Sequence, residues 1–207
     1  SASETTICNG DTTVLSLTGE TGTIQWQSSS DNSTWTDITG ETANSYTTPA
    51  LTALTYYRAE VTSGYCPSET SNVLTITVNE LPAITAQPST STQNLCQNAT
   101  PTDLSITATG TNITYQWYSN TSESTTAATT ITGATSASYT PMTNTATNLY
   151  YYCVVSGDCT PAVTSSFSGL ITVSPTTVAG TPSASETTIC NGDTTVLSLT
   201  GETGTIQ

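Results

Sequence analysis

Residues 24–46, IQWQSSSDNSTWTDITGETANSY, decide the fold class of this 207-residue chain. Apolar and polar residues alternate around Trp26, and alternation with a period of two predicts a β-strand with one buried face. Ser, Asn, Asp and Gly then mark turns before a short segment that ends at Tyr46. No stretch of the chain keeps the 3.6-residue period of an amphipathic helix. We therefore expect an all-β protein with Trp26 in its core.

A second copy of this pattern follows later in the chain. YQWYSNT at 115–121 matches IQWQSSS at 24–30, and ITGATSASYT at 131–140 matches ITGETANSYT at 38–47. Each copy has about seven short segments separated by turn residues, a spacing typical of immunoglobulin-like antiparallel β-sandwiches. The repetition places Trp117 in a second core, equivalent to that of Trp26. The sequence therefore predicts two related sandwiches in tandem.

A longer repeat predicts the domain organisation. Residues 1–25 recur without a change at 183–207, and such identity indicates a copied tandem array. Short joints that contain proline, NELPAITAQP at 79–88 and SPTTVAGTP at 174–182, indicate stiff connectors. We expect a head-to-tail array of three parts: a first module at 1–78, a second at 79–174, and at 175–207 the start of a third that copies the first.

The charged residues exclude several classes of function. The chain has 15 Asp and Glu, one base (Arg58), no His and a net charge of −14. Nucleic-acid binding needs a basic surface, and the common triads and zinc sites need His or closely spaced Cys pairs. We therefore expect no enzyme activity, no cofactor, no metal and no nucleic-acid partner. No apolar run is long enough for membrane insertion.

Cysteines at matched positions in small β-modules indicate disulfides and an oxidising, extracellular compartment. Because Cys190 is the copy of Cys8, each period holds five cysteines, and at least one of them lacks a partner within its period. The disulfide candidates are Cys8, Cys66, Cys96, Cys159 and Cys190. Cys153 stays unassigned.

Two schemes of disulfide pairing remain open. Cys8 precedes the second strand of its module and Cys66 follows the penultimate one. These strands run in the same direction in an immunoglobulin-like sandwich, which separates the two cysteines by roughly 20 Å, whereas a disulfide needs Cα atoms within about 7 Å. Head-to-tail packing instead favours Cys8–Cys159 between modules. The rival scheme is ordinary pairing within a module, Cys8–Cys66.

The same two schemes extend to the remaining cysteines. Between modules, Cys96 would bond to the equivalent of Cys66 in the next copy, and Cys190 to the equivalent of Cys159. Within a module, Cys96 would bond to Cys159, or to Cys153 in its place.

Two aromatic residues are candidates for exposed contacts with a ligand. Trp35 and Tyr65 have no aromatic counterpart in the second module, whereas Trp26 and Trp117 recur and fall on the inward face of their strands.

The residues quoted so far carry a resemblance to a known family. WQSSSDNSTWTDITGETANSYTTPALTALTYYRAEVTSGYC at 26–66 and ICNGDTTVLSLTG at 7–19 resemble immunoglobulin-like repeats of giant gliding adhesins of Bacteroidota, of the SprB type. The resemblance implies export by the type IX secretion system, a cell-surface location, and a filament shaft that serves adhesion and gliding motility. It implies as partners the neighbouring repeats, a substratum polysaccharide and surface motor proteins. Asp11-Thr12-Thr13 and its copy resemble the O-glycosylation acceptor of that phylum, at Thr12 and Thr194.

Two alternative functions follow from the same sequence. One is a glycan- or protein-binding module that uses Trp35 or Tyr65. The other is a non-catalytic spacer in a secreted enzyme that degrades polysaccharides.

Overall fold

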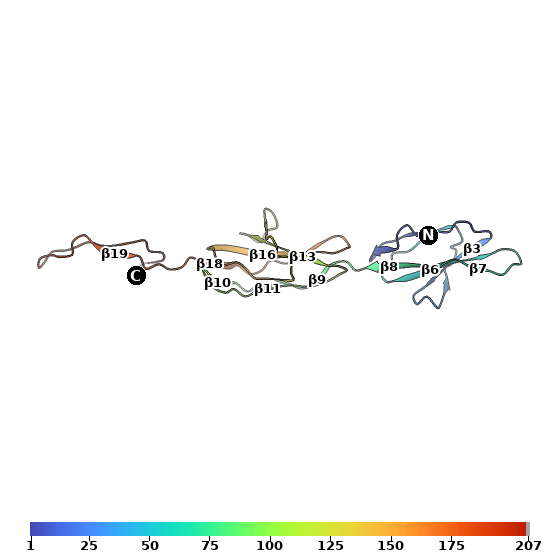
Figure 1. Ribbon diagram of the computed structural model, residues 1–207, viewed down its shortest axis with the longest axis horizontal. Helices are drawn as coiled ribbons and strands as arrows, with labels where there is room; N and C mark the ends of the chain where they lie inside the picture. Colours follow the sequence, from blue (N-terminus) through green and yellow to red (C-terminus); the bar gives the residue numbers. More distant parts are fainter. Residues whose placement is uncertain (206–207) are drawn as a thin grey trace. The chain divides into compact units, whose positions relative to one another are not determined.

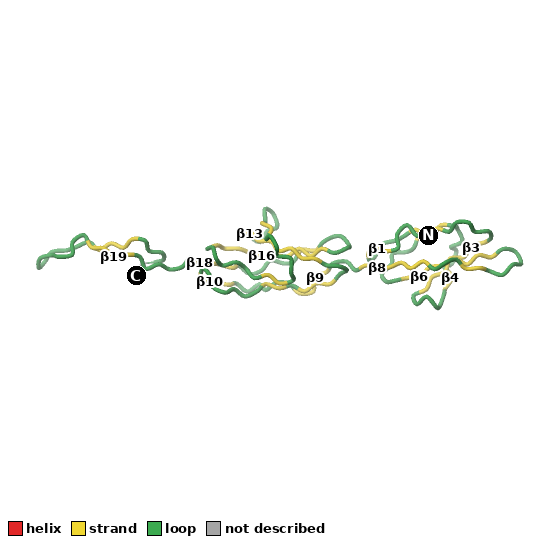
Figure 2. Tube along the Cα trace, viewed as in Figure 1, coloured by secondary structure: helices red, strands yellow, loops and turns green. Residues whose placement is uncertain are grey.

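The computed structural model describes residues 1–205. Short strands joined by loops make up this part of the chain, without a helix (Figures 1 and 2). Consequently, no helix among these residues is long and apolar enough to cross a membrane. The predicted fold class is confirmed, because the strands form immunoglobulin-like β-sandwiches in tandem.

The first sandwich contains the strands β1 to β8. Its larger sheet has the order β1-β8-β6-β3-β4, with β7 paired to β6, and β2 and β5 form a separate pair. The bounds are Thr6–Cys8 (β1), Val14–Ser16 (β2), Thr23–Ser29 (β3), Thr36–Asp37 (β4), Ser45–Thr47 (β5), Thr55–Thr62 (β6), Glu69–Thr70 (β7) and Leu74–Asn79 (β8).

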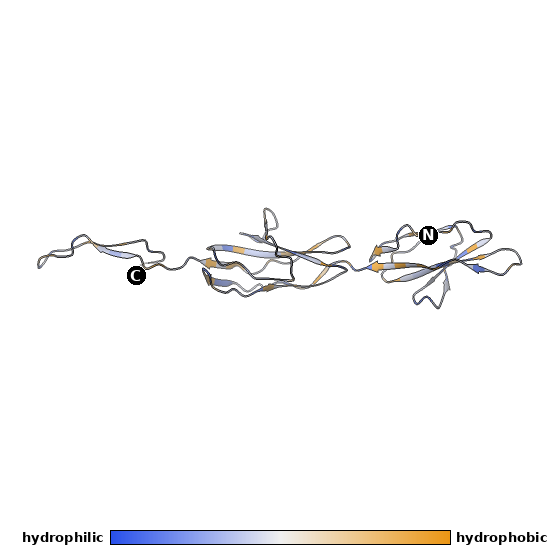
Figure 3. Ribbon diagram, in the orientation of Figure 1, coloured by the Kyte–Doolittle hydropathy of each residue, from blue (hydrophilic) through white to orange (hydrophobic). Residues whose placement is uncertain are grey.

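The core of the first sandwich follows the alternation of its strands. Trp26 on β3 is 1% exposed and its ring packs against Tyr46, which in turn contacts Tyr57. The indole N–H of Trp26 donates to the carbonyl oxygen of Ala43 at 2.9 Å, so its one polar atom is satisfied. Hydrophobic segments of β1 and β8 pair beside each other (Figure 3).

The second sandwich repeats this plan with the strands β9 to β18. Its larger sheet has the order β10-β18-β16-β13-β14 with β17 paired to β16, and β11 pairs with β15 and β12 with β9. The bounds are Ala83–Ala86 (β9), Gln93–Cys96 (β10), Leu104–Ser105 (β11), Thr107–Thr109 (β12), Thr114–Asn120 (β13), Thr129–Thr130 (β14), Ser138–Tyr139 (β15), Thr147–Ser156 (β16), Val163–Thr164 (β17) and Ile171–Ser174 (β18).

The second core repeats the tryptophan and the two tyrosines at the centre of the first. Trp117 is fully buried and packs against Tyr139, which contacts Tyr151. Its indole N–H donates to the carbonyl oxygen of Ser136 at 2.9 Å. The expected core positions of both tryptophans agree with the structure.

One feature of the sheets goes beyond the alternation pattern. β1 pairs with β8, and β10 with β18, in the parallel direction, whereas β3–β6, β6–β8 and β16–β18 are antiparallel. A parallel pair cannot be joined by a tight hairpin, so its two strands come from distant parts of the sequence. Here β1 lies beside β8, the last strand of the first sandwich, and β10 lies beside β18, the last strand of the second. Cys8 thereby comes next to Asn79, and Cys96 next to Ser174.

A separate two-stranded sheet follows the second sandwich. β19 (Thr181–Ala184) pairs antiparallel with β20 (Leu197–Thr200). The last two residues of the predicted third module, 206–207, lie outside the described residues.

The chain forms two compact units whose borders do not follow the sandwiches. The first unit contains residues 1–85 together with the loop segments 108–114 and 155–163 of the second sandwich. These two segments and the end of β8 therefore form one compact region, which is described next.

Candidate functional site: the junction around the Cys8–Cys159 disulfide

Cys8 is held at the end of β1 by a tight turn. Asp11 N–H donates to the Cys8 carbonyl oxygen at 2.9 Å, and the Asp11 carboxylate accepts the Cys8 N–H at 3.3 Å. Gly10 has a φ of 94°, a conformation that L side chains rarely adopt, so the turn depends on glycine there. The parallel neighbour of this turn is Asn79, whose carbonyl oxygen accepts the N–H of Asn9 at 2.9 Å.

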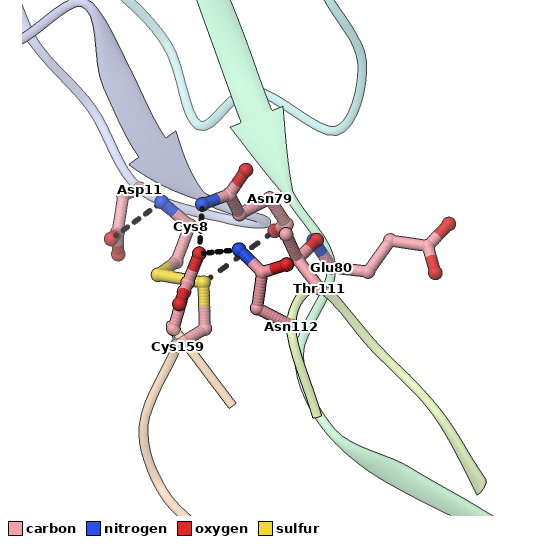
Figure 4. The surroundings of a disulfide bond; sticks show 8 residues. Cys8, Asp11, Asn79, Glu80, Thr111, Asn112 and Cys159 are labelled. Carbon is pink, nitrogen blue, oxygen red and sulfur yellow. Dashed lines mark hydrogen bonds between the residues drawn. A yellow bond between two sulfur atoms is a disulfide. The ribbon is translucent and has the colours of Figure 1, made fainter. Parts of the chain in front are cut away.

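A disulfide joins Cys8 to Cys159, which follows β16 in the second sandwich (Figure 4). The two Cα atoms are 5.7 Å apart, within the usual range for a disulfide. Cys159 is 1% exposed, and its sulfur lies 3.7 Å from the carbonyl oxygen of Asn79. Of the two schemes that the sequence left open, the structure contains the bond between modules. Cys66 and Cys96 carry free thiols, so neither Cys8–Cys66 nor Cys96–Cys159 is formed.

Backbone groups of the segment after β8 bond directly to a loop of the second sandwich. Glu80 N–H donates to the Thr111 hydroxyl at 2.8 Å, and Thr111 N–H donates back to the Glu80 carbonyl oxygen at 3.1 Å (Figure 4). The Thr111 carbonyl oxygen accepts the N–H of Asp158 at 3.1 Å. Thr111 therefore links the connector to the loop that carries Cys159.

The side chain of Asp158 ties three segments together. One carboxylate oxygen accepts the side-chain N–H groups of Asn112 at 2.8 Å and of Asn79 at 3.5 Å. A charged acceptor strengthens such bonds, although exposure of Asp158 and Asn112 to solvent weakens their net contribution. We call Cys8, Asn79, Glu80, Thr111, Asn112, Asp158 and Cys159 the junction cluster.

Two glycines allow the loops of the junction to approach closely. A Cβ on Gly110 would lie 2.9 Å from the Cα of Pro82 and 2.8 Å from Ile113 Cγ2, and the φ of Gly110 is 137°. A Cβ on Gly157 would lie 2.8 Å from the Thr111 carbonyl oxygen. All three distances are shorter than real Cβ contacts permit, so any larger residue at either position forces the backbone apart.

Sequence reasoning identified the two cysteines but not the rest of the junction cluster. Asn112, Asn79 and Asp158 lie in loops or at a strand end, and no periodicity marks them. The sequence holds one signal for this cluster. SGYC at 63–66 in the first module corresponds to SGDC at 156–159 in the second, so that Asp158 stands beside the cysteine that forms the bond.

The Cys96 turn has the same backbone geometry as the Cys8 turn. Gln97 N–H donates to the Ser174 carbonyl oxygen at 2.8 Å, and Ala99 N–H donates to that of Cys96 at 3.0 Å. Asn98 takes the place of Gly10 with a φ of 68°. Cys96, like Cys66 and Cys190, is exposed with a free thiol.

Cys153 occupies the place that Ala59 has in the first sandwich. Ala59 N–H donates to the Ser71 hydroxyl at 2.9 Å, and Cys153 N–H donates to the Ser165 hydroxyl at 2.9 Å. Both residues are fully buried. Burial raises the pKa of the Cys153 thiol to about 11. The unassigned cysteine is thus a small core residue, which free Cys commonly is.

Trp35 and Tyr65, the expected exposed aromatics, differ in their surroundings. The side chain of Tyr65 is fully exposed. Trp35 is only half-exposed, because the guanidinium of Arg58 lies 4.2 Å from its ring centroid. Arg58 is fixed there by its Nε–H, which donates to Gln27 Oε1 at 2.7 Å. A cation–π contact therefore covers one face of Trp35, and its role in ligand contact stays a prediction.

The remaining candidate residues lie in surroundings that form no binding or modification site. Thr12 and Thr194 are exposed, in agreement with accessibility to modification but without any feature that would select them. Within residues 1–205, no three Cys, His, Asp or Glu side chains lie together as metal ligands would.

The family comparison matches most of the chain. Residues 1–80 and 85–175 match a family model described as a domain of unknown function, DUF8696. No curated protein sequence matches the chain.

Solved structures of similar fold are tandem or paired immunoglobulin domains. The chain is similar to the N-terminal eight immunoglobulin domains of the Down syndrome cell adhesion molecule (12% identity, TM-score 0.52), over 85% of this chain and 24% of that one. It is similar to an I-band fragment of titin (15%, 0.52), over 82% of this chain and 62% of that one. The chain is also similar to a marsupial T cell receptor (14% identity, TM-score 0.53), over 89% of this chain and 75% of that one. The chain thus spans about a quarter of the first structure and less than two thirds of the second, and the likeness concerns the fold.

Proposed function

We propose that this chain, which belongs to the DUF8696 family of domains of unknown function, is a segment of the shaft of a long extracellular adhesin filament. We place its modules at 1–78, 79–174 and 175–207. Its tandem immunoglobulin-like domains support a structural or adhesive repeat segment. The role is mechanical and non-catalytic, and the segment supplies length, stiffness and resistance to unfolding.

The observation that carries this proposal is the junction cluster. A binding module needs an open surface, whereas here a disulfide and several hydrogen bonds join one sandwich to a loop of the next. The Cys8–Cys159 bond closes a loop with a sequence separation of 151. By chain-entropy arithmetic such a bond disfavours the unfolded chain by about 5 kcal/mol. Hydrogen bonds through Thr111 and Asp158 then limit movement about the bond.

The same clamp repeats along the filament. Because the Cys96 turn reproduces the geometry of the Cys8 turn, Cys96 bonds to the equivalent of Cys66 in the next copy. Cys190 bonds to the next equivalent of Cys159. Each of the three exposed free thiols of this segment therefore forms a disulfide with a cysteine of a neighbouring copy, while buried Cys153 forms none.

The surroundings of the filament follow from composition and resemblance. Six cysteines and one disulfide favour an oxidising, extracellular location at the cell surface. The net charge of −14 keeps neighbouring shafts apart at low salt. Export by type IX secretion, gliding motility, and contact with substratum polysaccharide or surface motor proteins complete the proposal, on the strength of the sequence resemblance alone.

Immunogold labelling of intact cells tests the proposed function. Antibodies raised against the chain should decorate filaments along their length at a regular axial spacing in electron micrographs. Label confined to the cell interior, or found only on secreted soluble protein, would contradict the shaft.

One observation favours a second candidate, a glycan- or protein-binding module: the ring of Tyr65 is fully exposed at the end of a hairpin. A glycan array would detect this function. Reproducible binding that is lost in Tyr65→Ala and Trp35→Ala, but kept in Val73→Ala, would favour it over the pure shaft. A spacer in a secreted polysaccharide-degrading enzyme would instead give label in the medium.

A further inference from the structure

Three side chains form a row across the outer face of the larger sheet in the first sandwich. Arg58 on β6 and Asp37 on β4 both lie directly opposite Gln27 on β3. Side chains that are paired in this way point to the same face of a sheet. Because their strand neighbours Trp26 and Ala59 are buried in the core, the row lies on the other face.

The amide of Gln27 fixes this row. Its Oε1 accepts the Nε–H of Arg58 at 2.7 Å, and its Nε2 donates to Asp37 at 2.8 Å and to Glu60 at 3.2 Å. Gln27 is only 7% exposed, and a buried amide with both its oxygen and its nitrogen bonded holds one orientation. The ring of Trp35, 4.2 Å from the guanidinium carbon, holds Arg58 from a second side. The guanidinium is therefore preorganised.

Donors and an acceptor stay unused around this guanidinium. Arg58 is the only base of the chain, yet within residues 1–205 it forms no ion pair, and its two Nη atoms have no hydrogen-bond partner. In the same part of the chain, the indole N–H of Trp35 and Oδ2 of Asp37 are also without a partner. Neither of these two side chains is buried. We call Gln27, Trp35, Asp37, Arg58 and Glu60 the Arg58 site.

The second sandwich shows that the fold does not need the Arg58 site. At the positions of Gln27 and Arg58 it has Tyr118 and Tyr152, whose ring centroids stack 5.1 Å apart. Tyr152 is buried, so aromatic packing closes this face of the second sandwich. The first sandwich instead keeps a buried amide and an unpaired guanidinium there. This difference points to a role other than stability.

The mixture of groups in the Arg58 site favours a neutral ligand rich in hydroxyls. A hydroxyl both donates and accepts, so neighbouring sugar hydroxyls can bond to the Arg58 Nη groups and to Asp37 at once. The site holds one positive and two negative side chains, so an acidic ligand would meet a net negative charge, as it would on the chain as a whole. The exposed part of the Trp35 ring offers an apolar surface for the C–H face of a sugar ring.

We propose that the Arg58 site binds a neutral hexose polysaccharide. The guanidinium of Arg58 donates to two neighbouring sugar hydroxyls, Asp37 accepts from a third, and Trp35 packs against the sugar ring. This inference rests on the second candidate function, the binding module, and gives it a ligand class and a set of residues. The purified chain can bind a sugar whether or not it comes from a filament, so this inference and the proposed shaft can fail separately.

A titration followed by NMR tests the proposal on the full chain. Because Arg58 is the only arginine, its Nε–H gives a single signal in a ¹H–¹⁵N spectrum, and each tryptophan gives one indole signal. The probes are cellohexaose, mannohexaose and a galactan hexasaccharide, with a galacturonate hexasaccharide as the acidic counterpart. We expect at least one neutral probe to shift the Arg58 and Trp35 signals to saturation. The Trp26 and Trp117 signals should stay in place, because both indoles are buried and bonded.

Two results of this titration would overturn the proposal. The first is an unchanged Arg58 signal with every neutral probe at its solubility limit. The second is a shift with the galacturonate probe alone, which would assign the site to acidic ligands.

Matched variants then test the role of the guanidinium. Arg58→Lys keeps the positive charge but loses the planar fork, so the Kd of the bound probe, followed by the Trp35 signal, should rise about tenfold. Glu69→Gln is the control, because Glu69 on β7 is an exposed charged residue of the same sheet outside the site, and its Kd should not change. An equal Kd for the native chain and Arg58→Lys would contradict the role of Arg58.

The Trp26 indole signal shows whether each variant is folded. If Arg58→Lys does not fold, Trp35→Leu replaces it, with the Arg58 Nε–H as the reporter. Loss of the ring that packs against the sugar should again raise the Kd about tenfold. An unchanged Kd in folded Trp35→Leu would overturn the proposed site.

Discussion

At the scale of single residues, the positions that sequence alone explains are those in the two cores. Trp26 and Trp117 recur in the same motif, and both are buried with the indole N–H bonded. Cys153 stayed unassigned because it was left over after the other cysteines were paired. YYYC at 150–153 matches YYRA at 56–59, and the hydrogen bonds to Ser165 and Ser71 show that Cys153 and Ala59 occupy the same place.

Cys153→Ala should fold normally, because alanine fills the equivalent site in the first sandwich. The expected loss in free energy of unfolding is about 1 kcal/mol, the cost of leaving a small cavity in the core. In the native chain, iodoacetamide at pH 8 should label Cys66, Cys96 and Cys190, which are exposed, but not Cys153. Rapid labelling of Cys153 would show that this region opens.

Alkaline pH should destabilise the fold. Burial raises the pKa of Cys153 to about 11 and those of Tyr57 and Tyr151 to about 12. These groups keep their protons in the native state at a pH where the unfolded chain has lost them, so stability present below pH 9 is lost as the pH rises toward 12. Urea unfolding followed by tryptophan fluorescence should give a lower midpoint at pH 10.5 than at pH 8. An unchanged midpoint would contradict the burial of these groups.

At the scale of elements, strand pattern and turn residues predicted the sandwiches, and the parallel pairing of β1 with β8 placed Cys8 beside the connector. The loops of the junction were not predictable from the same pattern. Thr111, Asn112 and Asp158 acquire their roles only when segments far apart in sequence come together. Side-chain periodicity records burial within a strand and carries no information about such loop partners.

Gly110→Ala should weaken the junction. The new Cβ would clash with Pro82 and Ile113, and the φ of 137° disfavours any side chain, so we expect a loss of about 1–3 kcal/mol in free energy of unfolding. Gly133→Ala is the matched control, because Gly133 also has a positive φ, 80°, but open space around it. Differential scanning calorimetry should show the larger drop for Gly110→Ala. Equal drops in melting temperature for the two variants would contradict a stabilising role for the close approach of Gly110 to Pro82.

At the scale of the whole molecule, the disulfide changes how the chain responds to force. The bonded cysteines have a sequence separation of 151, so the part of the chain between them cannot extend while the bond is intact. Reduction should therefore add about 500 Å of contour length in single-molecule stretching. The Cys8→Ser, Cys159→Ser double variant should show the longer extension without reductant. Equal contour lengths before and after reduction would mean that no such bond bears load.

The most direct test of the account is the identity of the bonded cysteines. The chain, purified under oxidising conditions with free thiols alkylated, is cleaved without reduction and its peptides are identified by mass spectrometry. Because Arg58 is the single residue after which trypsin can cleave this chain, a protease that cleaves beside aromatic or acidic residues is required. The account predicts a Cys8 peptide linked to a Cys159 peptide, with Cys153 unbonded. A Cys8 peptide linked to Cys66 would contradict it.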